Sequence, residues 1–182
     1  CAVLFIIADR KNIAKKAIEL VQTKYNLQWQ AGNISFICIG KQAEKHVKLR
    51  GMRIVESHNE IFDSLNFEHV SVIAEQIMKN FADEKYDKVE LVYNQFLNAA
   101  SQINKTEQFL PVEMETEDTK KQFYDYIFEP SKEYMIQELI PKSLKIQFYK
   151  ALLDSHAAEH GARMTAMHQA TDNATDLLKE LT

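Results

Sequence analysis

Residues 2–8 read AVLFIIA, an unbroken run of apolar side chains. Such a run is typical of a β-strand that is buried on both faces, as in a sheet covered by helices on either side. A second run, ISFICI at residues 34–39, ends at Gly40. Between the two runs, apolar residues recur at helical spacing: Ile13, Ala14, Ala17, Ile18 and Val21. The chain therefore opens with a strand, a helix and a strand, the unit from which parallel sheets are built.

The alternation of helices and strands continues after this unit. The sequence predicts a short basic surface helix at residues 41–50 and a short strand at residues 53–56. It predicts an amphipathic helix at residues 70–81 and another strand at residues 88–96 (KVELVYNQF). Residues 97–112 fit an extension of that strand followed by an antiparallel return. The fold class that follows is α/β, with a Rossmann-like, mainly parallel sheet flanked by helices.

The last segment, residues 141–182, predicts one long helix. Pro141 suits the first turn of a helix, because its missing N–H is not needed there, and only Gly161 interrupts good helix formers. At about 1.5 Å per residue the helix would be roughly 60 Å long, whereas a compact domain of this size is roughly 30–35 Å across. We expect a globular α/β foot domain at residues 1–140 and a long C-terminal shaft helix at residues 141–182. About half of the helix would then extend past the sheet and form part of a coiled coil.

Small residues shape the surface of this predicted helix. Alanine recurs every four residues, at Ala158, Ala162, Ala166, Ala170 and Ala174. A four-residue step overshoots one helical turn by about 40°, so the alanines drift around the helix and form a broad, smooth face. We interpret this face as a packing surface for helices outside the chain. The alternative is a helix that is rich in alanine only because alanine favours helices.

Composition excludes several classes of protein. The net charge of −4 argues against a nucleic-acid binder, and no apolar run approaches the roughly 18 residues of a membrane span. Two cysteines do not suggest a disulfide scaffold, and Cys38 is expected to be a buried, unreactive thiol in a reducing, intracellular setting. The chain starts inside an apolar run without an initiator methionine, so we expect it to be a piece of a longer protein.

One motif suggests a metal. His156, Glu159 and His160 match the H-x-x-E-H pattern of inverted zinc proteases, which places two histidines on one face of a helix. Zinc catalysis would need a third ligand and an open position for water, and no second cluster supplies that ligand. The sequence favours the alternative, two surface histidines on a solvated helix face.

Other candidate sites are weaker. Gly40-Lys41 lies outside any glycine-rich phosphate loop and reads as a strand-to-helix turn. Asp9 and Arg10 follow the first strand and are interpreted as an ion pair. The densest basic stretch is interpreted as a solvated helix face, with an anionic partner as the alternative: Lys41, Lys45, Lys48, Arg50 and Arg53. We expect neither an active site nor a cofactor.

The long helix also carries a recognisable sequence. Residues 158–167 (AEHGARMTAM) and 170–174 (ATDNA) closely resemble the S-E-x-A-A-R-M-x-A-M…A-T-x-N-A segment of the gamma subunit of F-type, rotary ATP synthase. Four shorter stretches resemble that family in the same order: ADR at residues 8–10, GK at 40–41, VYNQF at 92–96 and YIFEP at 126–130. The resemblance spans nearly the whole chain.

The chain also departs from the pattern of this family. A glycine-rich stretch usually follows the D-R pair, whereas here Lys11-Asn12 follow at once, either because the loop is shorter or because residues are missing from the sequence. The N-terminal helix of the family would precede Cys1, and its last helix, with an I-T-x-E signature, would follow Thr182. The resemblance therefore implies the central domain with part of the shaft.

The resemblance implies a non-catalytic rotor subunit of the central stalk, with no cofactor. Such a subunit couples proton or sodium flow through a membrane ring to ATP synthesis on the beta subunits by rotation. The implied partners are the alpha and beta subunits of the catalytic hexamer, the epsilon subunit and the membrane c-ring. The implied location is the cytoplasmic face of the bacterial inner membrane, peripherally and without insertion into the bilayer.

Particular residues are implied to contact these partners. Tyr126, Phe128 and Glu129 match a corner that the family uses near the rotor ring, and they are expected to contact polar loops of the ring. The implied contact residues of the shaft are Ala162, Arg163, Ala166, Met167, Ala170 and Ala174. Arg163 lies one turn after Glu159, and a pair between them would contribute only a few tenths of a kcal/mol.

Two other functions remain open from the sequence. One is a Rossmann-like, ligand-binding regulatory domain with a helical oligomerisation arm. The other is a zinc hydrolase built on the histidine motif.

Overall fold

The computed structural model describes residues 2–8, 11–98, 101–112 and 131–181. The expected ion pair of Asp9 and Arg10 lies outside these residues. So does the expected ring-contact corner with Tyr126, Phe128 and Glu129.

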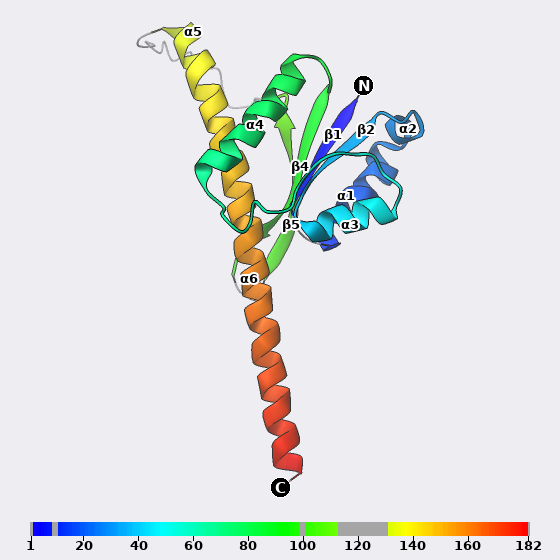
Figure 1. The fold of residues 1–182 in the computed structure, drawn as a ribbon, viewed down its shortest axis with the longest axis vertical. Coiled ribbons are helices and arrows are strands. Elements are labelled where there is room, and N and C mark those ends of the chain that lie inside the picture. Colours follow the sequence, from blue (N-terminus) through cyan, green and yellow to red (C-terminus); the bar gives the residue numbers. More distant parts are fainter. Residues whose placement is uncertain (1, 9–10, 99–100, 113–130, 182) are drawn as a thin grey trace, which may run out of the picture.

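A five-stranded sheet forms the centre of the molecule (Figure 1). Its strands lie in the order β3 (Ile54–His58), β2 (Ile34–Ile39), β1 (Val3–Ala8), β4 (Lys88–Phe96) and β5 (Gln102–Leu110). The first four run parallel, and β5 pairs antiparallel with β4. The prediction of a mainly parallel α/β sheet with an antiparallel return is confirmed.

Helices cover both faces of the sheet, which explains why β1 is apolar at every position. On one face, Leu4, Ile6 and Ala8 belong to the core with α4 (Phe67–Ala82) and the long helix α6 (Ile140–Glu180). On the other face lie α1 (Lys11–Lys24) and α3 (Lys41–Leu49), which pack against the remaining side chains of β1: Val3, Phe5 and Ile7. Because successive side chains of a strand point to opposite faces, only a continuous apolar run can fill both cores.

Local signals set the ends of several helices. Gly40 has a φ of 102°, in the left-handed region that favours glycine, and so forms the expected turn from β2 into α3. The Asn66 side chain accepts a 2.9 Å hydrogen bond from the His69 backbone N–H and caps α4. This cap starts α4 earlier than its apolar pattern predicts. The short helix α2 (Asn26–Gln30) was not predicted, because it buries no residue and so leaves no periodic signal.

The long helix α6 begins at Ile140, one residue before the predicted start, and Pro141 lies in its first turn as predicted. Helical structure continues upstream through a π-helical turn at Met135–Leu139 and a short α5 (Lys132–Tyr134). A proline in a helix removes one backbone hydrogen bond and crowds the turn before it. The wider π-helical turn lies where α6 accommodates this proline.

Two side-chain hydrogen bonds fix the direction of α6. Gln147 Nε2 donates to Glu107 of β5 at 3.5 Å, and Gln102 Nε2 donates to the carbonyl oxygen of Ala158 at 2.6 Å. In the sheet, Glu107 pairs with Leu91 of β4, and Gln102 pairs with Phe96 at the end of β4. Because Gln147 precedes Ala158 along α6 just as Leu91 precedes Phe96 along β4, the two elements run side by side in the same direction. It leaves the sheet at the carboxyl ends of the parallel strands and projects far beyond them (Figure 1).

Among the described residues, no helix combines the length and the apolar character that crossing a lipid bilayer requires.

Candidate functional site

The first part of α6, residues 140–162, is the docked half, because one stripe of it packs on the sheet. Phe148 is fully buried and lies against Phe109 with ring centroids 5.8 Å apart. Lys145 also pairs with Glu75 of α4 at 2.5 Å. The buried stripe recurs every three or four residues, as a helix with one face on a core requires: Leu144, Phe148, Ala151, Leu152, Ser155, Ala158 and Gly161.

The second part, residues 163–180, is the projecting half. Every residue from 166 to 180 is exposed, and the exposed set includes Met164, Met167, Leu177 and Leu178. Isolated helices shorter than about 12–15 residues are marginal in water, and most helical stability in proteins comes from a packed face. The projecting half is therefore a candidate surface for contact with another protein.

The structure divides the alanine series between these halves. Ala158 is buried against the sheet, Ala162 is partly buried, and Ala166, Ala170 and Ala174 are exposed. The prediction of one smooth face for outside partners is therefore wrong for its first member. The cause is the drift of about 40° per step, which turns the start of the series toward the sheet of its own chain. Five predicted contact residues are exposed on the projecting half: Arg163, Ala166, Met167, Ala170 and Ala174.

The expected pair of Arg163 and Glu159 is present. Arg163 Nη2 donates to Glu159 Oε1, one helical turn back, at the junction of the two halves. Because Arg163 is exposed, the pair contributes only a few tenths of a kcal/mol.

A hollow of about 680 Å³ lies beside this junction. It is bordered by the first residues of α1 and α3, Lys11 and Lys41, by Asp63 before α4, and by the Arg163–Glu159 pair. Open α/β sheets often bind ligands at this edge. Here the charges are mixed and no glycine-rich loop is present among the described residues, so the hollow does not favour a nucleotide.

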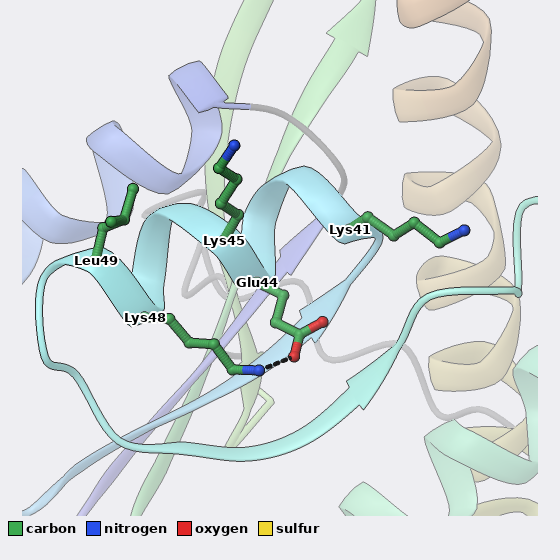
Figure 2. Close-up of a pocket in the computed structure, with 5 residues that line it drawn as sticks. All are labelled: Lys41, Glu44, Lys45, Lys48 and Leu49. Atoms are coloured by element: carbon green, nitrogen blue, oxygen red, sulfur yellow. Dashed lines mark hydrogen bonds and ion pairs between the residues drawn. The ribbon is translucent and has the colours of Figure 1, made fainter.

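The basic helix α3 borders a second, open hollow of about 420 Å³, shown in Figure 2. Lys48 donates to Glu44 within the helix, and Asn59 Nδ2 donates to the same carboxylate at 2.5 Å. These bonds lower the pKa of Glu44 to about 2. The predicted basic residues are exposed, as expected for a solvated face: Lys41, Lys45, Lys48, Arg50 and Arg53.

The two histidines of the zinc motif lie together, but not on a fully solvated face. His156 Nε2 is 3.0 Å from His160 Nε2, and the His156 ring stacks on Phe62 with centroids 5.4 Å apart. Partial burial, with a smaller effect of His160, lowers the pKa of His156. Only His160 is exposed, so the prediction of two surface histidines is wrong for His156.

A catalytic zinc site lacks support. Within the described ranges, no group of three or more His, Cys, Asp or Glu side chains is placed to hold a metal ion. The two histidines therefore have no third protein ligand there, which the hydrolase alternative requires.

Two further buried side chains, Cys38 and Glu90, carry ionisable groups. Cys38 is buried as predicted, and burial raises the pKa of its thiol to about 12. Glu90 in β4 is also buried, and sequence reasoning missed it. Its carboxylate accepts from the Tyr25 hydroxyl and lies 3.1 Å from Lys88 Nζ. The available signal was a single acid inside the apolar strand KVELVY.

Comparison with known proteins adds to this geometry. Residues 10–182 match a family model described as ATP synthase. The ATP synthase gamma chain of Christiangramia forsetii is 54% identical over 164 residues, covering 90% of this chain and 57% of that protein. The gamma chain of Cytophaga hutchinsonii is 47% identical over 177 residues, covering 96% of this chain and 60% of that protein. The chain thus spans less than two thirds of the length of these curated relatives.

Solved structures share the fold. A chain in the central stalk and c-ring of the Tetrahymena thermophila mitochondrial ATP synthase has a TM-score of 0.65 at 24% identity, covering 93% of this chain and 76% of that chain. A chain in the rotor of the Euglena gracilis mitochondrial ATP synthase has a TM-score of 0.59 at 18% identity, covering 98% and 70%. At such identities the likeness concerns the fold alone.

Proposed function

Because this chain belongs to the ATP synthase family, we propose that it is a rotor subunit in the central stalk of that complex. Its relatives with high identity are gamma chains of bacterial ATP synthases. In this role it is non-catalytic and couples the flow of protons or sodium ions through a membrane ring to ATP synthesis on the beta subunits.

The observation that carries the proposal is the projecting half of α6. It leaves the sheet domain as a single helix and exposes methionine, leucine and alanine side chains. Its docked half is held by the buried stripe with Phe148 at its centre and by Gln102 and Gln147. A shaft that transmits torque needs both features, a fixed base and a surface that partners surround.

The proposed partners follow from the two ends of the molecule. The alpha and beta subunits of the catalytic hexamer surround the projecting half, where Arg163, Ala166, Met167, Ala170 and Ala174 lie exposed and Ala162 lies at the base. The epsilon subunit and the membrane c-ring contact the sheet domain, with Tyr126, Phe128 and Glu129 as the proposed ring contacts. The complex would hold the chain at the cytoplasmic face of a bacterial inner membrane.

Assembly with purified alpha and beta subunits tests this proposal. We expect the natural full-length polypeptide that contains these residues to elute with the hexamer in size-exclusion chromatography. Ala170→Glu with Ala174→Glu should weaken this association, because two bulky charges would enter the packed surface. The matched control is Asn12→Glu with Gln22→Glu, two exposed positions on α1 that add the same charge. An Ala170/Ala174 variant that assembles as well as the control variant would contradict the assignment of this surface.

A further inference from the structure

The histidine pair on α6 has no role in the proposed function, yet its geometry is specific. His156 and His160 lie one helical turn apart, with Nε2 atoms 3.0 Å apart and ring centroids 4.5 Å apart. They lie close to the point where the docked half ends and the projecting half begins. Two imidazole nitrogens at this distance are close enough to share one metal ion.

The distance can be compared with metal geometry. Imidazole nitrogens bind zinc at about 2.0–2.1 Å, so two nitrogens on one ion at an angle of about 95–110° lie roughly 3.0–3.4 Å apart. The observed separation is at the lower end of that range. Histidines at positions i and i+4 are also the spacing with which helical zinc sites supply two ligands from one face.

We propose that His156 and His160 form a two-ligand site for a divalent transition metal ion, with zinc as the reference ion. Neutral imidazole is a ligand that zinc, copper and nickel accept, and water would complete the coordination shell. The site is distinct from a zinc hydrolase, which needs three protein ligands.

The surroundings of the two rings support the site. His156 is stacked on Phe62, with an angle of 29° between the ring planes, so its orientation is held by the core beneath it. His160 is exposed and borders an open hollow of about 320 Å³, through which an ion and its water ligands have access. One ring is thus positioned and the other is accessible. Glu159 is engaged by Arg163 and is not counted as a ligand.

A bound ion would join two successive turns of α6 beside its exit from the sheet. Because the ion binds the folded helix and holds these turns together, it would stabilise the folded chain by mass action. The competing state is an N–H···N hydrogen bond between the two neutral rings, which the same separation allows. The two states exclude each other, because the metal occupies the lone pairs of both nitrogens.

Calorimetric titration of the chain with Zn(II), at pH 7.5 in a buffer without competing ligands, tests the site. We expect saturation at one ion per chain. His160→Gln should weaken binding at least about tenfold, since loss of even an outer partner of a metal ligand costs about 10–100-fold. His156→Gln should have the same effect. Zinc should also raise the thermal midpoint of the original chain and not that of His160→Gln.

The matched control is His168→Gln, an exposed histidine on the same helix, which should bind zinc as the original chain does. His160 is exposed, so its replacement leaves the core intact, and circular dichroism without metal checks this for each variant. If saturable zinc binding is absent, the hydrogen-bonded state is the correct description. Binding that the double variant His156→Gln/His160→Gln retains, or that His168→Gln removes equally, would also overturn the proposal.

Discussion

Phe148 is the central residue in the contact between α6 and the sheet. Its ring is fully buried against Phe109. We expect Phe148→Ala to lower the free energy of unfolding by about 3–5 kcal/mol, through lost burial and the cavity that remains. Urea denaturation measures this value. The control is Ile146→Ala, a half-exposed position on the same helix, which should change stability by about 0.5 kcal/mol or less. Equal effects at both positions would contradict the docking described.

Cys38 provides a test of burial at a single atom. Because burial raises the pKa of its thiol to about 12, almost no thiolate forms at pH 8. In a Cys1→Ser background, we expect iodoacetamide to leave Cys38 unmodified in the folded chain and to modify it rapidly in urea. Mass spectrometry after timed quenching measures the modified fraction. Rapid modification without urea would mean that β2 is not covered as the structure has it.

The carboxylate of Glu44 in α3 should affect how the free energy of unfolding depends on pH in acid. Hydrogen bonds from Lys48 and Asn59 lower its pKa from 4.5 to about 2 in the folded chain. A lowered carboxyl pKa means that its stabilising contribution is complete above about pH 4.5 and is lost as the pH falls through about 2. We therefore expect Glu44→Gln to reduce the loss of stability between these values. Unfolding free energies measured across this range check the slope, and identical slopes in the two chains would contradict the network.

At the scale of elements, the two halves of α6 should differ in stability. The docked half is held by the core, whereas the projecting half is exposed along its length. In the chain without partner subunits, we expect amides at residues 166–180 to exchange hydrogen much faster than those at residues 144–158. Hydrogen exchange read by mass spectrometry measures both segments. Equal protection would mean that the projecting half is covered, for example by a second copy of the chain.

The sequence predicts those elements whose apolar side chains repeat regularly. The runs at residues 2–8 and 34–39 form strands that helices cover on both faces of the sheet. Strands in such a position need apolar side chains at every residue, which is the pattern that the sequence shows. The pattern is weaker where side chains are exposed, and α2 was missed for that reason. The start of α6 is predicted to within one residue, because proline favours the first turn of a helix, whereas the π-helical turn that precedes it was not predicted.

The candidate site could be predicted only in part. The exposed alanines and Met167 follow from helical spacing, since distance along one helix is fixed by the sequence. The side chains that fix α6 on the sheet could not be predicted, because Gln102 and Ala158 are distant in sequence and meet only when β5 and α6 are packed. The same holds for Phe62 beside His156. Contacts between distant elements depend on the whole fold.

At the scale of the whole molecule, a three-layer domain carries one helix that extends beyond it (Figure 1). The domain and the docked half share one core, to which Phe148 and its neighbours on α6 belong. This arrangement supports the proposed role of a rotor shaft.

Single-molecule rotation tests the central claim most directly. The natural full-length polypeptide would carry Gln22→Cys, at an exposed position of α1, in the Cys1→Ser background for attachment of a bead, and would be assembled with an immobilised hexamer of alpha and beta subunits. With ATP present, a rotor subunit should turn the bead continuously in one direction, in steps that reflect the three beta subunits. A bead that only fluctuates about a fixed angle, on complexes that hydrolyse ATP, would contradict the account.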